Sequence, residues 1–273
     1  MDELLELSRT TRRLIGKAIY YFDLITPGDR IGVGLSGGKD STLLLYALAL
    51  WRRWSPVKFG LKAFTVDMTK GQWDVRPLKA LCQMLDVDYQ VIPLPIVELV
   101  ERREERSPCS FCANLRRGHL NSVAVSQGCN KLALGHNLDD TAETALMNLF
   151  HGGRFRAYQP KLYHDRANIT LIRPLVYLTE DRIRAENKRL NLEQYYLDYV
   201  CPFSKETERS RTKKLVAELM VRFPTLRQNI QHALETLDGE DQWKKTSVLR
   251  RDDNLGPTGN ERRKEAQEQP TKD

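Results

Sequence analysis

Six consecutive residues in the first quarter of the chain combine two glycines with a lysine, an aspartate and two serines. They are Ser36, Gly37, Gly38, Lys39, Asp40 and Ser41. The paired glycines permit a tight turn, and the backbone N–H groups at a helix start carry about half a positive charge. A phosphate group therefore binds readily where such a turn opens a helix, and Lys39 adds a mobile full charge beside it. The segment predicts a phosphate-binding loop.

The residues on either side of this loop predict the elements that hold it. Ile31, Val33 and Leu35 alternate with glycines, as in a buried strand. An apolar run follows Asp40 and Ser41, and either of these residues can begin a helix. The loop is therefore expected to join a buried strand to a buried helix.

Other phosphate and nucleophile motifs overlap on the same residues. Gly32, Gly34 and Gly37 match the dinucleotide pattern G-x-G-x-x-G, but the first two lie inside the predicted strand rather than in the turn. Ser36 lies in the hydrolase pattern G-x-S-x-G, which normally stands on a central strand, whereas only one predicted strand precedes it. The pattern G-x-x-x-x-G-K-[ST] fails because Asp40 follows the lysine.

Cysteines form a second candidate site. Cys109 and Cys112 make a C-x-x-C pair, expected on a loop that enters a basic helix, where thiolate is favoured. Cys201 is a third candidate ligand. Three thiolates with an open position are the pattern of a catalytic iron–sulfur cluster, whereas structural zinc needs four ligands; the residues alone leave both open, with a disulfide-exchange pair as a third reading. Cys82 and Cys129 are predicted to be packed thiols.

Polar residues also follow two of the predicted strands. They are Asp67, at the end of strand 58–67, and Gly135, His136, Asp139 and Asp140, at and after the end of strand 131–135. Ligands of a doubly wound sheet bind beyond the carboxyl ends of its strands, and Asp139 or Asp140 could supply oxygen ligands for Mg²⁺ carried by a nucleotide. Acids in a first helical turn also serve simply to complement the helix dipole, and His136 could be a packing histidine.

The whole chain predicts an α/β fold, with a doubly wound, mostly parallel five-stranded sheet, an N-terminal helix and a C-terminal helical extension. The expected strands are 31–35, 58–67, 89–94, 131–135 and 169–172, and the expected helices include 3–25, 74–85, 179–190 and 208–222. The expected divisions are a helix at 1–28, a nucleotide-binding domain with the C-x-x-C segment at 29–178, a helical part carrying Cys201 at 179–240 and a disordered tail at 241–273.

Composition narrows the class of protein. The 273 residues are 41% hydrophobic and 29% charged, as in ordinary soluble globular proteins. The longest apolar run, 43–51, is far shorter than the roughly 20 residues of a membrane span, and no secretory signal is visible, so we expect a cytoplasmic protein that does not enter a membrane. A net charge of +7 is compatible with a nucleic-acid partner. Basic residues cluster in the first helix and behind Cys201, although such clusters also occur on solvated faces.

The SGGKDS loop is similar to the pyrophosphate loop of the PP-loop ATP pyrophosphatase superfamily. Three further features follow it: the C-x-x-C pair with LRRG behind it, the segment GHNLDD from Gly135, and a distant single cysteine at 201. With these features the chain, over about residues 10–220, resembles the tRNA 2-thiocytidine synthetase family. It lacks the paired cysteines of the two zinc ribbons that the sister tRNA 2-thiouridine synthetases carry.

The resemblance implies an enzyme that uses ATP to adenylate a cytidine carbonyl in the anticodon loop of tRNA and then transfers sulfur. It implies a [4Fe–4S] cluster on Cys109, Cys112 and Cys201, and catalytic roles for these cysteines, Lys39 and Asp139. ATP and Mg²⁺ are expected to bind at residues 36–41 together with Asp67, Gly135, His136 and Asp140. Arg116 and Arg117 are expected to contact RNA. The implied partners are tRNA and a cysteine desulfurase or other sulfur donor, and a homodimer is expected. The alternatives are a 2-thiouridine synthetase-like or other PP-loop tRNA-modifying enzyme, and a zinc-stabilised RNA-binding module without catalysis.

Overall fold

The structure is a computed structural model that describes residues 4–69, 71, 73–103, 108–198 and 207–237. Cys201 and the tail expected at 241–273 lie outside these residues. The chain divides into two units, 1–235 and 236–273, and almost all of the second unit lies outside the described residues.

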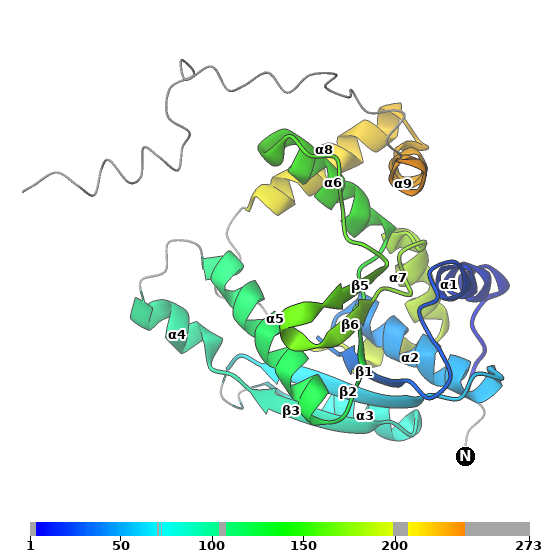
Figure 1. Ribbon diagram of the computed structural model, residues 1–273, viewed down its shortest axis with the longest axis vertical. Helices are drawn as coiled ribbons and strands as arrows, with labels where there is room; N and C mark the ends of the chain where they lie inside the picture. Colours follow the sequence, from blue (N-terminus) through cyan, green and yellow to red (C-terminus); the bar gives the residue numbers. More distant parts are fainter. Residues whose placement is uncertain (1–3, 70, 72, 104–107, 199–206, 238–273) are drawn as a thin grey trace, which may run out of the picture. The chain divides into compact units, whose positions relative to one another are not determined.

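Six strands form one sheet in the order β3-β2-β1-β4-β6-β5 (Figure 1). They are β1 (Arg30–Gly34), β2 (Gly60–Asp67), β3 (Asp88–Pro93), β4 (Lys131–Ala133), β5 (Lys161–His164) and β6 (Ile169–Ile172). Neighbouring strands are parallel except β5, which pairs antiparallel with β6. From β1 the chain proceeds to one edge of the sheet, and it then returns to place β4 on the other side of β1. The loops after β1 and β4 therefore diverge, which is where a doubly wound sheet binds its ligand.

The predicted fold class is confirmed, but the number of strands is corrected from five to six. The additional strand, β5, lies between the expected strands 131–135 and 169–172, in a segment where no strand is predicted. It has one ladder partner, and the side chains of Leu162 and Tyr163 are exposed. The segment therefore carries no buried apolar run that would indicate a strand.

Nine α-helices and two short 3₁₀ helices, Asp165–Ala167 and Leu192–Tyr195, are present among the described residues. The α-helices are α1 (Arg9–Tyr21), α2 (Lys39–Trp54), α3 (Arg76–Met84), α4 (Ile96–Arg103), α5 (Pro108–Ser126), α6 (Leu138–Gly152), α7 (Glu180–Arg189), α8 (Glu208–Arg222) and α9 (Leu226–Thr236). The first helix is shorter than predicted, because Ser8 caps its start and Asp23 takes a left-handed conformation, φ 46°, after its end. α4 and α9 are not predicted from the sequence, whereas β6 and α8 match their predicted bounds. In the described part of the chain, no helix is both long and apolar enough to cross a membrane.

Two apolar cores cover the two faces of the sheet. Leu61 and Ala63 of β2 face a core built with α1, α2, α3 and α7, whereas Phe64 and Val66 face a core that includes α4 and α5. This alternation follows from the two-residue period of a strand. α2 is buried on all sides from residue 41 to residue 50, because it lies between the sheet and the outer helices. The phosphate-binding loop is thus fixed at the end of the most buried helix.

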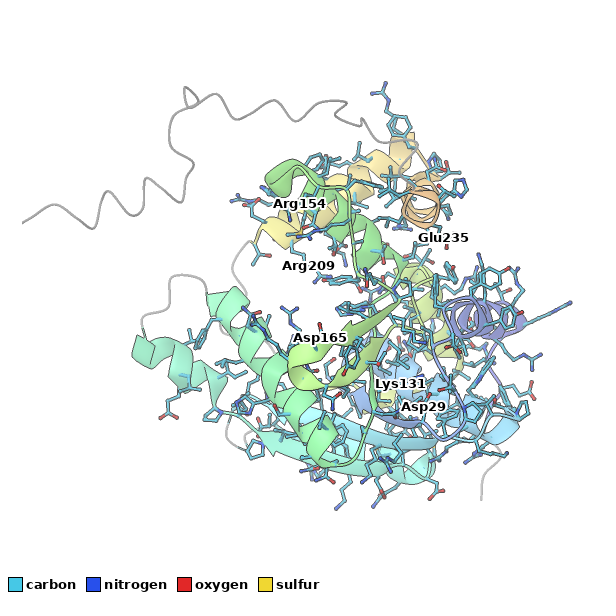
Figure 2. The ribbon with its side chains drawn as sticks, in the orientation of Figure 1. Asp29, Lys131, Arg154, Asp165, Arg209 and Glu235 are labelled. Carbon is cyan, nitrogen blue, oxygen red and sulfur yellow. The ribbon has the colours of Figure 1, made fainter. Side chains whose placement is uncertain are left out.

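A buried ion pair joins the central strands at the edge of the sheet opposite this loop. Asp29, just before β1, accepts from Lys131, the first residue of β4, at 2.7 Å, and both side chains are less than a tenth exposed (Figure 2). The lysine also donates to the Leu24 carbonyl at 3.0 Å. Pairing and hydrogen bonding make burial of these charges tolerable. The contact fixes β1 against β4, and so fixes the spacing of the two loops at the other edge.

The C-terminal helices have a small core of their own. Ala142, Ala145 and Leu146 of α6 pack against Val216 of α8 and Ile230 of α9. Since α6 begins at the loop after β4, this core brings α8 and α9 to the carboxyl edge of the sheet.

Candidate active site

The loop after β1 requires glycine at residue 37 for two reasons. Gly37 has φ +79°, which side-chain-bearing residues rarely adopt, and a Cβ atom there would lie 2.4 Å from Cγ of Leu197. Leu197 also donates its N–H to the Gly37 carbonyl at 3.0 Å. The contact ties the loop to the segment after α7, so the loop conformation is held from outside as well as by its own sequence.

Gly38 is the N-cap of α2, and no side chain occupies the N–H groups that open this helix. α2 begins at Lys39, one or two residues earlier than predicted. Ser41 shapes the loop from inside: its Oγ accepts from the Ser36 N–H at 3.0 Å and lies 3.0 Å from the Ser36 Oγ. An anion can therefore bind to the N-terminal N–H groups of α2. Ser36 has no histidine partner among the described residues, which counts against the hydrolase reading.

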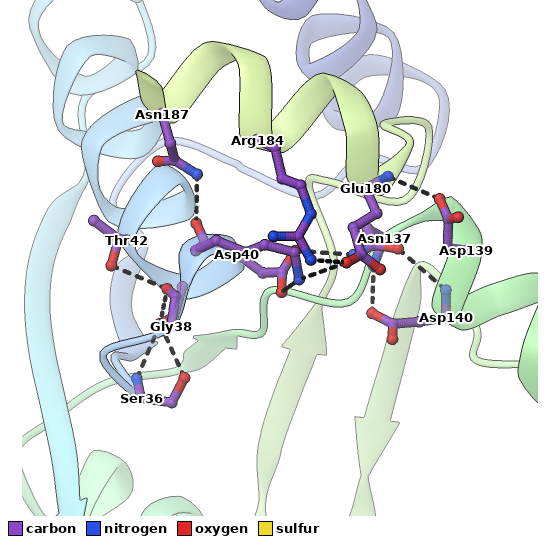
Figure 3. Close-up of polar contacts among 12 residues, drawn as sticks. Ser36, Gly38, Asp40, Thr42, Asn137, Asp139, Asp140, Glu180, Arg184 and Asn187 are labelled. Carbon is purple, nitrogen blue, oxygen red and sulfur yellow. Dashed lines mark hydrogen bonds and ion pairs between the residues drawn. The ribbon is translucent and has the colours of Figure 1, made fainter. Parts of the chain in front are cut away.

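Lys39 lies between the carboxylates of Asp40 and Glu180, both of which Figure 3 labels. Its Nζ donates to Asp40 Oδ2 at 2.8 Å and lies 3.6 Å from Glu180 Oε1 of α7. Asn187, also on α7, donates to the Lys39 carbonyl at 3.0 Å. The Lys39 side chain is about one-fifth exposed, and its ammonium is paired only with side-chain carboxylates among the described residues. An incoming phosphate could therefore replace Asp40 or Glu180 as its partner.

The loop after β4 packs directly on the phosphate-binding loop. Gly135 allows this approach, because a Cβ atom there would lie 3.1 Å from the Asp40 carbonyl carbon and from the Ser41 nitrogen. Asn137 donates from Nδ2 to Asp40 Oδ1 at 2.9 Å. It also caps α6 in a reciprocal pair with Asp140. The two loops that diverge at the switch point are therefore bridged by one asparagine.

Asp139 and Asp140 have their carboxylate oxygens engaged. Asp139 accepts from the Glu180 N–H at 2.8 Å and from Arg227 at 2.7 Å, and Asp140 accepts from the Asn137 N–H at 3.0 Å and from Arg209 at 2.5 Å. Burial raises the pKa of both carboxyl groups. As they are placed, a cation that reached them would share each carboxylate with an arginine. No three His, Cys, Asp or Glu side chains converge as a metal site within the described residues.

Asp67 lies at the predicted position, at the carboxyl end of β2, but its carboxylate closes a turn. It accepts from the N–H and hydroxyl of Thr69 at 2.8 and 2.7 Å, and from the Gly71 N–H at 2.5 Å. The side chain is 3% exposed. The structure therefore gives Asp67 a role in shaping the loop beside the crevice, and direct nucleotide contact stays a prediction.

The C-x-x-C pair lies in the first turns of α5 rather than on the predicted loop, because the helix begins at Pro108, a residue that favours a first helical position. Cys112 is half-buried, and its Sγ is 3.6 Å from Sδ of Met68, the residue after β2. This contact places Cys112 at the carboxyl edge of the sheet. The side chain of Cys109 and the whole of Cys201 lie outside the described residues.

Cys82 and Cys129 are packed thiols, as predicted. They are 1% and 5% exposed, and burial raises the pKa of Cys82 to about 12 and also raises that of Cys129. A thiol whose pKa is raised by burial is not a thiolate at neutral pH and is a poor metal ligand.

The predicted RNA-binding arginines, Arg116 and Arg117, are exposed on α5. Arg117 donates to the Ala113 carbonyl at 3.2 Å and to Asn114 Oδ1 at 3.1 Å. The basic cluster of the first helix lies elsewhere: Arg9, Arg12 and Arg13 line a cavity of about 650 Å³ with Trp51 and Trp54, at the far end of α2 from the phosphate-binding loop.

Comparison with known proteins decides the family. A profile of the PP-loop domain matches residues 7–200. The chain is 39% identical over 232 residues to the tRNA-cytidine(32) 2-sulfurtransferase of Syntrophotalea carbinolica, a match that covers 84% of this chain and 89% of that protein. It is 37% identical over 230 residues to the protein of the same name from Geobacter metallireducens, covering 83% and 89%. The chain belongs to the tRNA 2-thiocytidine synthetase family of PP-loop proteins.

A solved structure extends this result. The U34-tRNA thiolase NcsA from Methanococcus maripaludis, determined with its [4Fe-4S] cluster, is similar with a TM-score of 0.68 and 26% identity, over 85% of this chain and 80% of that chain. In the present family member, the PP-loop is the segment 36–41, and the residues that follow β2 and β4 surround it.

The polar residues that sequence reasoning missed come from the C-terminal half of the chain. They are Asn137, Glu180, Arg209, Lys213 and Arg227. Asn137 carried a local signal, because it precedes Asp140 by the three residues of a capping box. Glu180, Arg209 and Arg227 contact Lys39 or the acids of α6 only through the tertiary fold, and Lys213 contacts Glu180 in the same way. Hydrogen bonds with Lys213 and Arg184 overcome the effect of burial and lower the pKa of Glu180 to about 2, so this carboxylate is charged at neutral pH.

Proposed function

We propose that this chain is an ATP-dependent sulfurtransferase that converts a cytidine in the anticodon loop of tRNA into 2-thiocytidine, at position 32 as in the names of its relatives. One observation carries the proposal. The PP-loop, with Lys39 at the start of α2, opens at the β1/β4 switch point, and the cysteine-bearing helix α5 reaches the same edge of the sheet through Cys112.

The PP-loop would serve the first step, adenylation. The carbonyl oxygen of cytosine is a poor leaving group, so it must first attack the α-phosphorus of ATP, forming a new O–P bond while the bond to pyrophosphate breaks. Negative charge grows on the departing pyrophosphate. Lys39 and the N–H groups at the start of α2 would stabilise that charge, because they are in place at the PP-loop before the reaction begins. Gly37 and Gly38 let the phosphates approach the backbone.

Sulfur enters in the second step. A sulfide adds to the activated carbon, the C–O bond breaks, and AMP departs with the oxygen. A [4Fe–4S] cluster on Cys109, Cys112 and Cys201 would supply this sulfur at an iron without a protein ligand. The half-buried Cys112, beside the end of β2, suits such a ligand, whereas the buried Cys82 and Cys129 do not.

Magnesium would enter with the ATP phosphates. Asp139 or Asp140 would serve as its ligand, and the metal would then compete with Arg227 or Arg209 for the carboxylate. Arg116 and Arg117, exposed on α5, would contact tRNA. A cysteine desulfurase or another donor would replace the sulfur after each turnover, and a homodimer is part of the proposal.

The test is a reconstituted reaction under anaerobic conditions. The purified protein is incubated with ATP, magnesium, sulfide and a tRNA transcript, and nucleosides are analysed by mass spectrometry, with a transcript that has uridine at position 32 as the control. We expect 2-thiocytidine in the first transcript only, with pyrophosphate and AMP released. Thiouridine at position 34 instead would favour the activity named for NcsA. A colourless zinc protein that binds tRNA and releases no pyrophosphate would leave only a binding module.

A further inference from the structure

A buried arginine directly after β6 has no acidic partner among the described residues. Arg173 follows β6 directly and is only 4% exposed. Its Nε donates to Nδ1 of His136 at 3.2 Å, its Nη1 donates to the Gln159 carbonyl, and its guanidinium carbon lies 5.1 Å from the centre of the Tyr158 ring. All of these partners are neutral. Among the described side chains, no carboxylate lies within ion-pair distance of Arg173.

His136 cannot supply the missing charge. Its Nδ1 accepts from Arg173, so the neutral ring carries its proton on Nε2, and the ring stacks on Tyr158 with centroids 4.2 Å apart. Burial, followed by the charge of Arg173, lowers the pKa of His136 to about 3. The imidazole therefore stays neutral at physiological pH and serves as a fixed acceptor for the arginine.

The surroundings add positive charge rather than balance it. Arg116, Arg117 and Arg209 also lie close enough to His136 to disfavour its protonation, and Arg117 likewise acts on Arg173. Arg209 pairs with Asp140 at 2.5 Å, whereas the partners of Arg117 in the described part of the chain are a carbonyl and an amide oxygen. Arg173 is buried and Arg117 is exposed, and neither has an acidic partner among the described residues.

Burying a cation without a counter-charge costs several kcal/mol, and burial lowers the pKa of Arg173 to about 10. Such a cost is offset when an anionic ligand completes the pair. Guanidinium groups match phosphate geometry, so the expected ligand is a phosphate.

The position favours an RNA phosphate over a phosphate of ATP. The PP-loop already provides N–H groups and Lys39 for the nucleotide, whereas Arg173 follows β6, which lies on the other side of β4 from β1 and its loop, and Arg117 is exposed on α5. His136 is one residue from Gly135, which touches the PP-loop, so this place adjoins the site of chemistry. We propose that Arg173 and Arg117 bind a backbone phosphate of the tRNA beside the nucleotide that is thiolated. The inference rests on the proposed function.

The experiment measures binding of an anticodon stem–loop and of ATP, separately, to the anaerobically purified full chain. Arg173→Met removes the charge and keeps much of the side-chain volume, and Arg173→Lys keeps the charge. Arg117→Met lies on an exposed helix surface and tests the same subsite without disturbing the core. Arg166→Met is the matched control, an exposed arginine in the turn that precedes β6 at the opposite edge of the sheet.

We expect Arg173→Met and Arg117→Met each to weaken RNA binding about ten-fold and to reduce the slope of log Kd against log salt by about one, as loss of one phosphate contact does. ATP affinity should be unchanged, Arg173→Lys should recover part of the loss, and Arg166→Met should match the wild type. A stem–loop with one neutral methylphosphonate linkage should identify the phosphate, because Arg173→Met will have no further effect on that RNA.

Three outcomes would overturn the inference: RNA binding unchanged in both methionine variants, a loss of ATP affinity with RNA affinity intact, or a loss in Arg173→Met that no methylphosphonate position suppresses. The measurements on the wild-type protein test the proposed function separately from the phosphate subsite. If the wild type binds and thiolates RNA while the variants behave like it, only the phosphate subsite is wrong.

Discussion

The carboxylate of Glu180 lies 3.6 Å from the ammonium of Lys39, and this pair connects the PP-loop to the C-terminal helices. Glu180 also accepts from Lys213 of α8 at 2.6 Å, and its N–H donates to Asp139 of α6. One residue at the start of α7 therefore joins the lysine of the PP-loop to α6 and α8. A phosphate that binds the ammonium of Lys39 must compete with the carboxylate of Glu180.

Removing the charge of Glu180 should make ATP bind more tightly. In Glu180→Gln the competitor for Lys39 is lost, and we expect a gain of about 1 kcal/mol, roughly five-fold in Kd, by calorimetry with a non-hydrolysable ATP analogue. The free energy of unfolding should fall by about 1–2 kcal/mol, because Lys213 and Arg184 lose a charged partner. The exposed Glu193→Gln controls for net charge. Weaker ATP binding would show that Glu180 holds Lys39 in the position that binds ATP, rather than competing with ATP for it.

Lys39→Ala should remove turnover and keep the fold. The lysine acts on charge that develops in the transition state, so pyrophosphate release in the presence of tRNA should fall about 10²–10³-fold. The free energy of unfolding should change by no more than about 1 kcal/mol, since Lys39 makes only partly exposed ion pairs. Exposed Lys58→Ala is the control. Undiminished pyrophosphate release would disprove the role of Lys39.

Gly37→Ala should damage the loop in two separable ways. The added Cβ meets Leu197, and the left-handed φ of +79° is strained for alanine. We expect a loss of about 2 kcal/mol or more in urea unfolding, together with weaker ATP binding. The double variant Gly37→Ala/Leu197→Ala relieves the contact and keeps the strain, so it should recover part of the lost ATP affinity. No recovery would assign the whole effect to backbone strain.

The five cysteines should separate into two groups. Serine at residue 109, 112 or 201 removes a thiolate ligand, so each variant should lose iron and the sulfur content of product tRNA. Alanine at Cys82 or Cys129 should retain iron, with a stability loss of about 1–3 kcal/mol from packing. Iron content and nucleoside analysis on all five variants provide the measurement. If Cys201→Ser keeps full iron while Cys129→Ala loses it, the third ligand is wrong.

Acid should destabilise the protein through His136. The folded-state pKa is lowered to about 3 from the ordinary 6.5, so the unfolded chain binds a proton that the folded chain does not as pH falls between these values. The contribution of His136 to stability is thus complete above pH 6.5 and is lost toward pH 3, by at most about 1.4 kcal/mol per pH unit. Buried carboxyl groups with raised pKa values, such as Asp139, act in the opposite sense.

The difference between wild type and His136→Asn in urea unfolding, measured from pH 8 to pH 4, isolates the histidine from these carboxyl groups. We expect the two curves of unfolding free energy to converge as pH falls. Parallel curves for His136→Asn would mean that the imidazole can take up its proton in the folded protein.

The sequence by itself determined the features that depend on neighbouring residues. The glycines of SGGKDS, the apolar run of α2 and the alternation in β1 define the PP-loop, because turn conformation and burial period are local properties. The same reasoning separated Cys82 and Cys129 from the C-x-x-C pair. It missed β5, whose exposed residues carry no burial pattern, and it placed the C-x-x-C pair on a loop where the structure has a helix.

Only the tertiary structure decided which charges meet. Arg209 and Arg227 reach Asp140 and Asp139 because α8 and α9 pack on α6, and Arg173 reaches His136 because β6 lies beside β4. These pairs are separated by 37 or more residues, so no local spacing signals them. Strand order and helix packing set such distances: they place Asp139 and Asp140 in ion pairs with arginines, and they bury Arg173 without an acidic partner among the described residues.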